Sequence, residues 1–345
     1  MAKKTSHYRY DTNRHQGSLF GDDADFVFNT PSQPEQAAKP ADPAPKAVDA
    51  DAIDSRLEVK VSPEFRFICF GSGSSGNCAY VGTPTEGVLI DAGVDMKKVF
   101  DTLKVNGIEP GMVKGVCLTH DHGDHVRYAY TYVRKYRHLK IYCTPRVLNG
   151  MLRRHNISRR IRESHVPIFK EIDFSLAGMK ITAFEVPHDG TCNSGFFIEN
   201  GELKFTIATD LGHINDRAEF YLSKANFMML ESNYDHAMLL NGSYPEYLKS
   251  RILNETGHLD NHDAATFVRD HYSPQLKYVF LCHLSNDNNT PEKAINEFAQ
   301  VLGPAGITIG LGQDTIEDRK CNLQVVALPR FDATHRYTTH RYILR

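Results

Sequence analysis

The sequence predicts an α/β (α+β) protein in which two β-sheets are covered by helices. Of its 345 residues, 41% are hydrophobic, an ordinary share for a globular chain with a proper core. Apolar runs with strand character first form a meander and then alternate with segments of helical periodicity, and this order occurs twice. We find no internal repeat of roughly 20 to 50 residues, the period that repeat proteins show.

The first 62 residues are expected to form a disordered tether. Residues 30–54 are rich in proline, alanine and acids and contain little to bury. No apolar stretch follows the lysines at the N-terminus, so we expect no signal peptide, no transmembrane helix and a cytoplasmic location. A folded domain is predicted over residues 63–320, with a C-terminal extension over 321–345.

The elements of the folded part follow from the apolar runs and their periodicity. Strands are predicted at 65–70, 77–82, 87–91, 114–119, 140–143, 179–186, 195–200, 204–210, 227–232 and 276–283. Helices are predicted at 95–106, 125–137, 145–154, 215–224, 244–254, 260–270 and 291–302. The seven cysteines lack CxxC spacing, and several lie inside apolar runs, so we expect reduced core residues and not disulfides or a cysteine zinc site.

A motif for metal binding follows the strand predicted at 114–119. Residues 119–125 read THDHGDH and contain His120, His122, Asp124 and His125. A strand end aims alternate side chains one way and the turn brings the next two around, so one loop can supply ligands to two neighbouring metals. A polar loop that contains histidines by chance is the alternative, which HxHxDH directly after a strand disfavours.

Three more ligand-type residues stand at the ends of later predicted strands. His188 follows ITAFEVP, Asp210 closes KFTIATD and His283 closes YVFLC. Each residue alone could be a satisfied polar cap. Three ligand-type residues that end strands in the order His, Asp, His predict that they share one site with the THDHGDH motif.

These motifs resemble those of the metallo-β-lactamase superfamily over about residues 65–290. The resemblance implies a four-layer αββα metallo-β-lactamase sandwich, two mixed β-sheets flanked by helices, as the catalytic domain. It also implies two divalent metal ions, with zinc favoured and manganese or iron as alternatives. In that arrangement one metal is held by His120, His122 and His188, the other by Asp124, His125 and His283, and Asp210 bridges them.

The same resemblance assigns supporting roles to three further residues. Asp91, in LIDAG, matches an aspartate that orients a ligand imidazole, although a strand-end turn is an equal explanation. Glu231 and His258 resemble the pair beside the metals of tRNase Z-like phosphodiesterases, where the glutamate holds the histidine in the tautomer that protonates a leaving oxygen. The alternative for His258 is a residue that only helps to cap the following helix.

Within the superfamily, the chain resembles the YycJ/WalJ group of 5′-to-3′ DNA exonucleases. The matching stretches are GSGSSGNC at 71–78, ESNYDHAMLLNGSYP at 231–245, GHLDN at 257–261 and HLSNDNN at 283–289. Asp260 stands where the group commonly has serine, and the N-terminal tether and the tail after about Lys320 do not match. The glycine-rich GSGSSGNC lacks the lysine and following helix of a phosphate loop, so we expect a β-turn in which Ser74, Ser75 or Asn77 contacts a substrate phosphate.

A basic stretch follows the histidine motif in a chain whose net charge is only −2. From Arg127 to Lys170 there are twelve lysines and arginines and a single acid, interleaved with tyrosines. Basic groups neutralise phosphates and aromatic rings stack on unpaired bases, which favours a nucleic acid substrate. The alternative is a solvated helix face with tyrosines that pack inward. The predicted substrate contacts in the stretch are Arg127, Arg153, Arg154, Arg159 and Arg160.

The sequence therefore predicts a binuclear-metal phosphodiesterase that hydrolyses nucleic acid, with DNA favoured, and more specifically a 5′-to-3′ DNA exonuclease. Asp124 and Asp210 are expected to position the attacking hydroxide, and His258, supported by Glu231, to protonate the leaving 3′-oxygen. A small-molecule (cyclic) phosphodiesterase and a tRNase Z-like RNA nuclease remain alternatives, as does a regulatory or scaffold protein with a structural metal centre. The sequence indicates no protein partner and no contact with a membrane.

Overall fold

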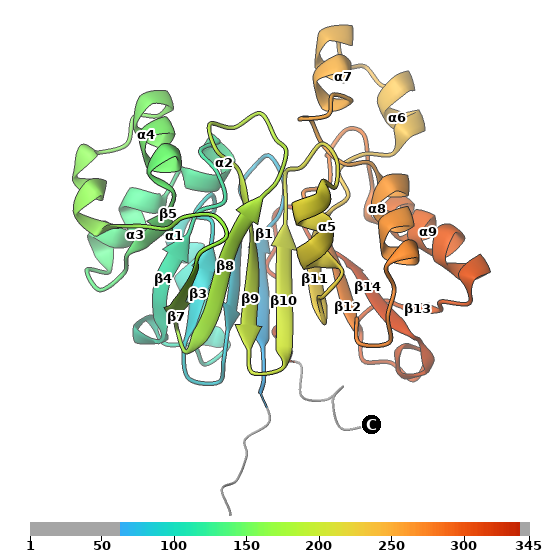
Figure 1. Cartoon of the computed structure of the whole chain (residues 1–345), viewed down its shortest axis with the longest axis horizontal. Helices are drawn as coiled ribbons and strands as arrows, with labels where there is room; N and C mark the ends of the chain where they lie inside the picture. The colour runs from blue at the N-terminus through green and yellow to red at the C-terminus, as the bar shows by residue number, and fades with distance from the viewer. Residues whose placement is uncertain (1–62, 339–345) are drawn as a thin grey trace, which may run out of the picture. The chain divides into compact units, whose positions relative to one another are not determined.

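Two mixed β-sheets pack face to face, with helices on their outer faces (Figure 1). This computed structural model describes residues 63–338, so the tether predicted over 1–62 lies outside the described residues. The central strands of each sheet, such as β3 (Gly87–Ile90) and β11 (Phe227–Glu231), are buried on both faces, which explains why they appear in the sequence as nearly continuous apolar runs. The predicted αββα architecture is confirmed.

The first sheet is antiparallel at one side and parallel at the other. In spatial order its strands are β15 (Tyr337–Thr338), β1 (Arg66–Gly71), β2 (Cys78–Gly82), β3 (Gly87–Ile90), β4 (Val113–Cys117), β5 (Ile141–Cys143) and β6 (His165–Pro167). The pairs from β15 to β3 are antiparallel and those from β3 to β6 are parallel. The carboxyl ends of β3, β4 and β5 therefore meet at one edge.

The second sheet has the same mixed character. In spatial order its strands are β13 (Ile309–Gly310), β14 (Leu323–Ala327), β12 (Tyr278–Cys282), β11 (Phe227–Glu231), β10 (Leu203–Ala208), β9 (Ser194–Asn200), β8 (Met179–Glu185) and β7 (Asp173–Leu176). The pairs from β7 to β10 are antiparallel and those from β10 to β13 are parallel. Strands β8, β10, β11 and β12 consequently all end at the same edge.

Three buried clusters hold the layers together. Alternate residues of both sheets, among them Phe67, Phe205 and Phe280, form the central layer. The outer face of the first sheet packs against α1 (Met96–Val105), α3 (Ala129–Lys135) and α4 (Pro145–Arg154). The outer face of the second packs against α5 (Asp216–Leu222), α8 (Asn261–Asp270) and α9 (Pro291–Leu302). The cysteines are free, and Cys69, Cys117 and Cys282 are buried in this core as expected.

Short helices connect or cap the larger elements. They are α2 (Gly123–Val126), α6 (His236–Asn241), α7 (Glu246–Ile252), and the 3₁₀ turns Pro110–Met112, Arg159–Ser164, Gly303–Ala305 and Asp318–Lys320. Side-chain caps start several of the long helices: Thr144 accepts from the Val147 amide and Thr290 from the Lys293 amide, each just before a proline at the first helical position. Within residues 63–338, no helix is both long enough and apolar enough to cross a membrane.

One predicted helix is interrupted in the structure. The helix expected over 125–137 is divided into α2 and α3, because the backbone on both sides of the break bonds to Ala92. The Ala92 amide donates to the His125 carbonyl over 2.7 Å, and the Tyr128 amide donates to the Ala92 carbonyl over 2.9 Å. These bonds fix the histidine motif against the end of β3. Because Ala92 is distant in sequence, the periodicity of residues 125–137 could not predict them.

The chain after residue 320 contributes to both sheets, although the sequence analysis placed a separate extension there. β14 pairs with β12 and β13 in the second sheet, and β15 pairs with β1 in the first. LQVVA is a short apolar run of the kind that a buried parallel strand requires. The folded unit therefore continues through the last described residues.

Candidate metal centre

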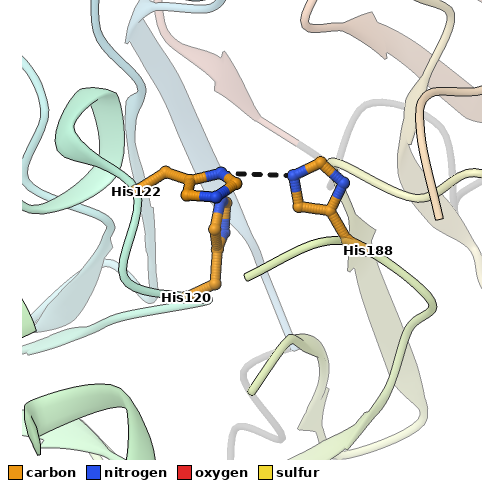
Figure 2. Close-up of side chains that lie close together, drawn as sticks. All are labelled: His120, His122 and His188. Atoms are coloured by element: carbon orange, nitrogen blue, oxygen red, sulfur yellow. Dashed lines mark hydrogen bonds between the residues drawn. The ribbon is translucent and has the colours of Figure 1, made fainter. Parts of the chain in front are cut away.

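Three histidines meet where β4 and β8 end. His120 and His122 extend from the loop after β4, and His188 comes from the loop after β8 (Figure 2). His122 Nδ1 lies 3.3 Å from His188 Nε2, and the ring centroids of His120 and His122 are 4.6 Å apart. One nitrogen from each ring lies within 4.8 Å of the other two, so a single cation can contact all three.

A second group of ligand-type side chains adjoins the first. His125 Nε2 lies 3.5 Å from Asp124 Oδ2 and 3.2 Å from Asp210 Oδ2. His283 Nε2 lies 3.4 Å from Asp124 Oδ2 and also 3.4 Å from Asp210 Oδ1. Asp210 Oδ1 is in turn 3.8 Å from His188 Nε2, so Asp210 stands between the two groups. The structure thus brings together all seven residues predicted as ligands.

Three residues of the site have a left-handed backbone within two residues of a strand end. The φ angles are 63° at Asp91, 55° at Asp210 and 55° at His283, which follow β3, β10 and β12. This conformation is uncommon for residues other than glycine and costs on the order of 1–3 kcal/mol each. The sharp turn it produces keeps each side chain at the edge of its sheet. Three such residues at one site indicate a geometry that the surrounding structure enforces.

The second ring nitrogen of four of the five histidines has a hydrogen-bond partner in the protein. His125 Nδ1 lies 2.7 Å from Asp91 Oδ2, and His283 Nδ1 lies 3.0 Å from Glu231 Oε1. Two more pairs are His120 Nδ1 with Thr119 Oγ1 (3.0 Å) and His188 Nδ1 with the Gly257 carbonyl (2.9 Å). His122 Nε2 lies 3.3 Å from Asp189 Oδ1 without the geometry of a hydrogen bond. Hydrogen-bonded partners fix the tautomer and the orientation of a ligand imidazole.

The donor set fits divalent metal ions. His120 Nε2 is buried and has no hydrogen-bond partner among residues 63–338, an arrangement that is costly unless a cation takes the lone pair. Burial, with the neighbouring imidazoles, lowers the pKa of His120 well below its ordinary value and that of His122 to about 4, so both rings are neutral. Neutral imidazoles and carboxylates are ligands that zinc, manganese and iron accept. The cluster and the fold together imply divalent metal ions.

The second group is electrostatically suited to positive charge. Burial would raise the pKa of Asp124, but His125 and His283 hold it far below its ordinary range. Burial likewise opposes a charge on His283, yet Asp210 with Asp124 and Glu231 raises the pKa of His283 to about 10. The carboxylates therefore favour a second proton on the His283 imidazole. A metal cation bound in place of that proton would be stabilised by the same negative charges.

Glu231 connects a ligand-type histidine with His258. Glu231 is fully buried at the end of β11, and its Oε1 lies 2.8 Å from His258 Nδ1 and 3.0 Å from His283 Nδ1. Burial raises the pKa of the Glu231 carboxyl, but His258 and His283 lower it below the ordinary value overall. An ionised carboxylate only accepts, so both Nδ1 atoms donate to it. Each ring is then left with Nε2 as its reactive nitrogen.

A small hollow gives access to this pair. It has a volume of about 150 Å³, and its wall contains His188, His258 and His283 together with Asp189 and Ser74. The side chain of His258 is 19% exposed, whereas that of Glu231 is 0% exposed. A group that enters from solvent therefore meets His258 and the ligand-type histidines, while Glu231 acts only through them.

Several residues that shape the site were not predicted. Asp189 pairs with Arg251 over 2.7 Å beside His122. It directly follows His188 in the sequence, and this adjacency was the signal that could have identified it. Asp121 lies inside the motif itself, and its buried carboxylate accepts from the amide and hydroxyl of Thr191 over 2.9 and 2.6 Å. It ties the histidine loop to the loop after β8. Asn233 donates to the His283 carbonyl over 2.7 Å, and its place in the ESNYDH stretch was the available signal.

The glycine-rich stretch forms a tight turn beside the cluster, with different positions for its polar residues. Asn77 is buried, and its amide lies 3.1 Å from Asp124 Oδ2 and 2.9 Å from His125 Nε2. It therefore positions ligand-type residues, whereas a contact with a substrate phosphate was predicted for this stretch. Ser74 is exposed at the hollow and Ser75 is half-buried. A Cβ at Gly93 would lie 1.5 Å from the Asp124 carbonyl, so only glycine permits this approach.

The basic stretch is exposed, but its tyrosines are not. Arg127, Arg153, Arg159 and Arg160 are exposed, while Arg154 is 3.4 Å from the buried Asp121 carboxylate. The tyrosines at 128, 130 and 136 are half-buried against the core under the first sheet, and Tyr132 is fully buried. Burial excludes stacking on a base for Tyr132, while stacking on the half-buried tyrosines stays a prediction. The positive charge remains at the surface.

Comparison with known proteins agrees with the fold and the motifs. Residues 87–283 match the family described as Beta-lactamase superfamily domain. Exodeoxyribonuclease YycJ of Bacillus anthracis is 34% identical over 250 residues, which cover 71% of this chain and 91% of that protein. Exodeoxyribonuclease WalJ of Streptococcus pneumoniae is 29% identical over 248 residues, which cover 72% of this chain and 91% of that protein.

A solved structure gives the same result for the fold. The metallo-β-lactamase fold protein YhfI of Bacillus subtilis has a TM-score of 0.56 at 13% identity, with 80% of this chain and 100% of that chain covered. At this identity the similarity shows the architecture alone. By its fold, its motif order and its similarity to YycJ and WalJ, the chain belongs to the metallo-β-lactamase superfamily and to the YycJ/WalJ group within it.

Proposed function

We propose that this protein is a binuclear-metal phosphodiesterase that hydrolyses DNA as a 5′-to-3′ exonuclease. His120, His122 and His188 would hold one cation and Asp124, His125 and His283 the other, with Asp210 between them. Zinc is the favoured cation, and the same ligands accept manganese or iron. The names of the relatives, both called exodeoxyribonucleases, support the substrate class.

The observation that carries the proposal is the hydrogen-bonded pair of Glu231 and His258 at the edge of the ligand cluster. His258 Nδ1 donates to Glu231 over 2.8 Å, and the His258 ring lies 5.1 Å from that of His188 and 5.2 Å from that of His283. A phosphodiester cannot expel an alkoxide easily, so a proton donor beside the scissile bond is the group that this chemistry needs. With Nδ1–H directed at Glu231, Nε2 faces the cluster, and in the imidazolium form of His258 this nitrogen carries the proton to be donated.

The residues of the chain have separate tasks in the proposed reaction. When bound, the two cations would neutralise charge on the phosphoryl oxygens and activate the attacking water. Asp124 and Asp210 would accept hydrogen bonds from that water and so set its direction. His258, as an imidazolium held by the Glu231 carboxylate, would give its Nε2 proton to the leaving 3′-oxygen and would return to the neutral ring that still donates Nδ1–H to Glu231.

The exposed arginines support a polymeric substrate. Arg153 lies at the end of α4, and Arg159 and Arg160 are in the 3₁₀ turn that follows. Each cation that contacts a phosphate releases counterions, so binding would weaken steeply as salt rises. A small cyclic phosphodiester would not need this surface.

The central experiment is hydrolysis of end-labelled single- and double-stranded DNA and RNA by protein of defined metal content. We expect mononucleotides to be released from the 5′ end of DNA, and His122→Ala to abolish the release. Activity that survives His122→Ala would disprove the assigned centre. Hydrolysis of RNA with no action on DNA would refute the DNA assignment in favour of an RNA nuclease.

The arginine surface has its own test with matched net charge. Arg159→Glu with Arg160→Glu should raise KM for DNA about tenfold or more, most strongly at low salt. Lys180→Glu with Lys224→Glu changes the net charge equally at two other exposed positions and should leave KM nearly unchanged. If both double variants raised KM equally, the effect would come from the net charge of the protein and not from this surface.

A further inference from the structure

A second hollow adjoins the proposed active site and is lined by cations. It has a volume of about 120 Å³ and lies between the glycine-rich turn at 71–77, the start of α1 and the segment after β14. Lys98, Arg127 and Arg330 contribute to its wall. Lys98 and Arg330 are half-buried and Arg127 is exposed, so the hollow holds positive charge near its floor and its rim.

None of these three cations forms an ion pair at contact distance among residues 63–338, although the Asp287 carboxylate attracts Arg330 from farther away. The Lys98 ammonium donates to the Phe331 carbonyl, and Arg127 donates to the Ser75 carbonyl over 3.2 Å. Arg330 donates to Ser74 Oγ over 3.1 Å and to the Leu284 carbonyl over 2.5 Å. These partners are neutral, so the positive charge of the hollow is not compensated by them.

The one acid in the lining, Asp95, is engaged elsewhere. Its Oδ1 caps α1 by accepting from the amides of Lys97 and Lys98, over 2.9 and 3.4 Å. A second polar group of the wall is unused: Ser75 Oγ is buried without a hydrogen-bond partner in the described part of the chain. Because a buried hydroxyl is costly to leave unpaired, this atom indicates a missing ligand.

The second hollow shares a wall residue with the first hollow and is connected to the metal-ligand cluster by the glycine-rich turn. Arg330 and Ser74 also line the first hollow, which contains His258 and His283. The glycine-rich turn connects the two, because Ser72 Oγ accepts from the His283 amide over 2.8 Å and Asn77 contacts Asp124. A Cβ on Gly73 would lie 3.1 Å from the Arg330 guanidinium, so the turn is fitted closely to this arginine.

We propose that this second hollow binds a phosphate group of the substrate strand next to the scissile phosphodiester. The inference rests on the proposed function and deepens it. Lys98, Arg127 and Arg330 offer charged donors to the phosphate oxygens, and arginine presents them in a planar fork that matches a phosphate. Phe331, 63% exposed at the same rim, offers a face on which the adjoining base can stack. The phosphate is either a 5′-terminal monoester or an internal diester.

Binding measured without turnover tests this proposal. The probes are single-stranded oligonucleotides with phosphorothioate linkages and a 3′ fluorophore, in one form with a 5′-phosphate and in another with a 5′-hydroxyl. Lys98→Gln, which keeps a donor toward the Phe331 carbonyl, is combined with Arg127→Ala, and Lys97→Ala is the control. Lys97 is the neighbour of Lys98 on α1 but is exposed and paired with Asp101.

We expect the double variant to raise Kd about tenfold or more and to reduce the slope of log K against log salt by about 0.7 for each phosphate that the variant no longer neutralises. The control should bind like the wild type. A weaker affinity confined to the 5′-phosphorylated probe identifies the terminal monoester, and an equal weakening with both probes identifies the internal diester. Thermal melting of both variants confirms that they are folded.

The proposal is overturned if the folded double variant binds both probes within twofold of the wild type. That outcome is distinct from failure of the proposed function, which would appear as metal-loaded wild type that hydrolyses no nucleic acid. Arg330→Lys gives an independent check, because it retains the charge but not the fork. Its Kd should rise less than that of the double variant.

Discussion

Replacing Glu231 by glutamine should impair both metal binding and turnover, although the two side chains have the same shape. In the structure Glu231 Oε1 accepts from His258 Nδ1, His283 Nδ1 and Asn233 Nδ2 over 2.8, 3.0 and 3.3 Å. Its Oε2 accepts from the amides of Leu211 and Leu259 over 2.8 and 3.3 Å. Every one of these donors needs an acceptor at the carboxylate.

Glutamine can satisfy only one side of this arrangement. In one orientation its NH₂ group faces the two backbone amides, and in the other it faces the two imidazole N–H groups. A hydrogen bond to a charged group contributes roughly 1.5–3 kcal/mol, so the loss of one corresponds to a factor of about 10 to 150. Residues that orient ligand imidazoles typically affect metal affinity by about 10- to 100-fold. We therefore expect kcat to fall about 100-fold and metal affinity to fall at least tenfold.

The measurements are kcat on end-labelled DNA, metal content by mass spectrometry and thermal melting of the same preparation. Glu297→Gln is a matched control, because Glu297 Oε1 lies 2.7 Å from His262 Nδ1 on the surface between α8 and α9. It removes a histidine–glutamate pair of the same geometry away from the metal centre and should change neither quantity. If Glu231→Gln kept its metal and a kcat within threefold of wild type, the shared carboxylate would have no part in the chemistry.

Three further results are expected. Asp91→Ala leaves the His125 ring without its 2.7 Å partner and should lower metal affinity about 10- to 100-fold in isothermal titration. Asp173→Ala, at an exposed site, is the control and should bind metal like the wild type. Equal affinities of the two variants would contradict the role of Asp91 in orienting His125. Phe67→Ala, at a side chain that is 2% exposed between the sheets, should lower the free energy of unfolding by about 3–5 kcal/mol in urea titrations, and a loss below about 1 kcal/mol would be inconsistent with the packing. A chain ended at Lys320 lacks strands of both sheets and should show no cooperative unfolding transition; a sharp transition would mean that these strands are dispensable.

The ligand set could be predicted because it is encoded locally. HxHxDH follows one apolar run, and His188, Asp210 and His283 each end another, so strand recognition alone places them at sheet edges. The parallel arrangement of β10, β11 and β12 then brings their carboxyl ends together. Resemblance to a known superfamily supplied the pairing of these residues into two groups.

Apart from Asp91 and the Glu231–His258 pair, which the resemblance supplied, the supporting contacts could not be predicted because they depend on segments distant in sequence. Arg330 is 256 positions from Ser74, and Glu231 is 52 positions from His283, so no local pattern connects either pair. The interruption between α2 and α3 depends on Ala92, from a different loop. The burial of Tyr132 could not be predicted because composition does not distinguish a ring that faces a helix–sheet interface from one that faces solvent.

The placement of β14 and β15 has a consequence for the order in which the molecule is completed during synthesis. Every ligand-type residue lies at or before position 283, whereas Arg330 lies between the two strands that join separate sheets. A nascent chain can therefore expose the whole metal-binding set before the second hollow exists. Since contacts of such large sequence separation form late and slowly, cations can bind to a partly folded chain in which the second hollow has not yet formed. The order of synthesis would then complete the proposed metal centre before the proposed phosphate site.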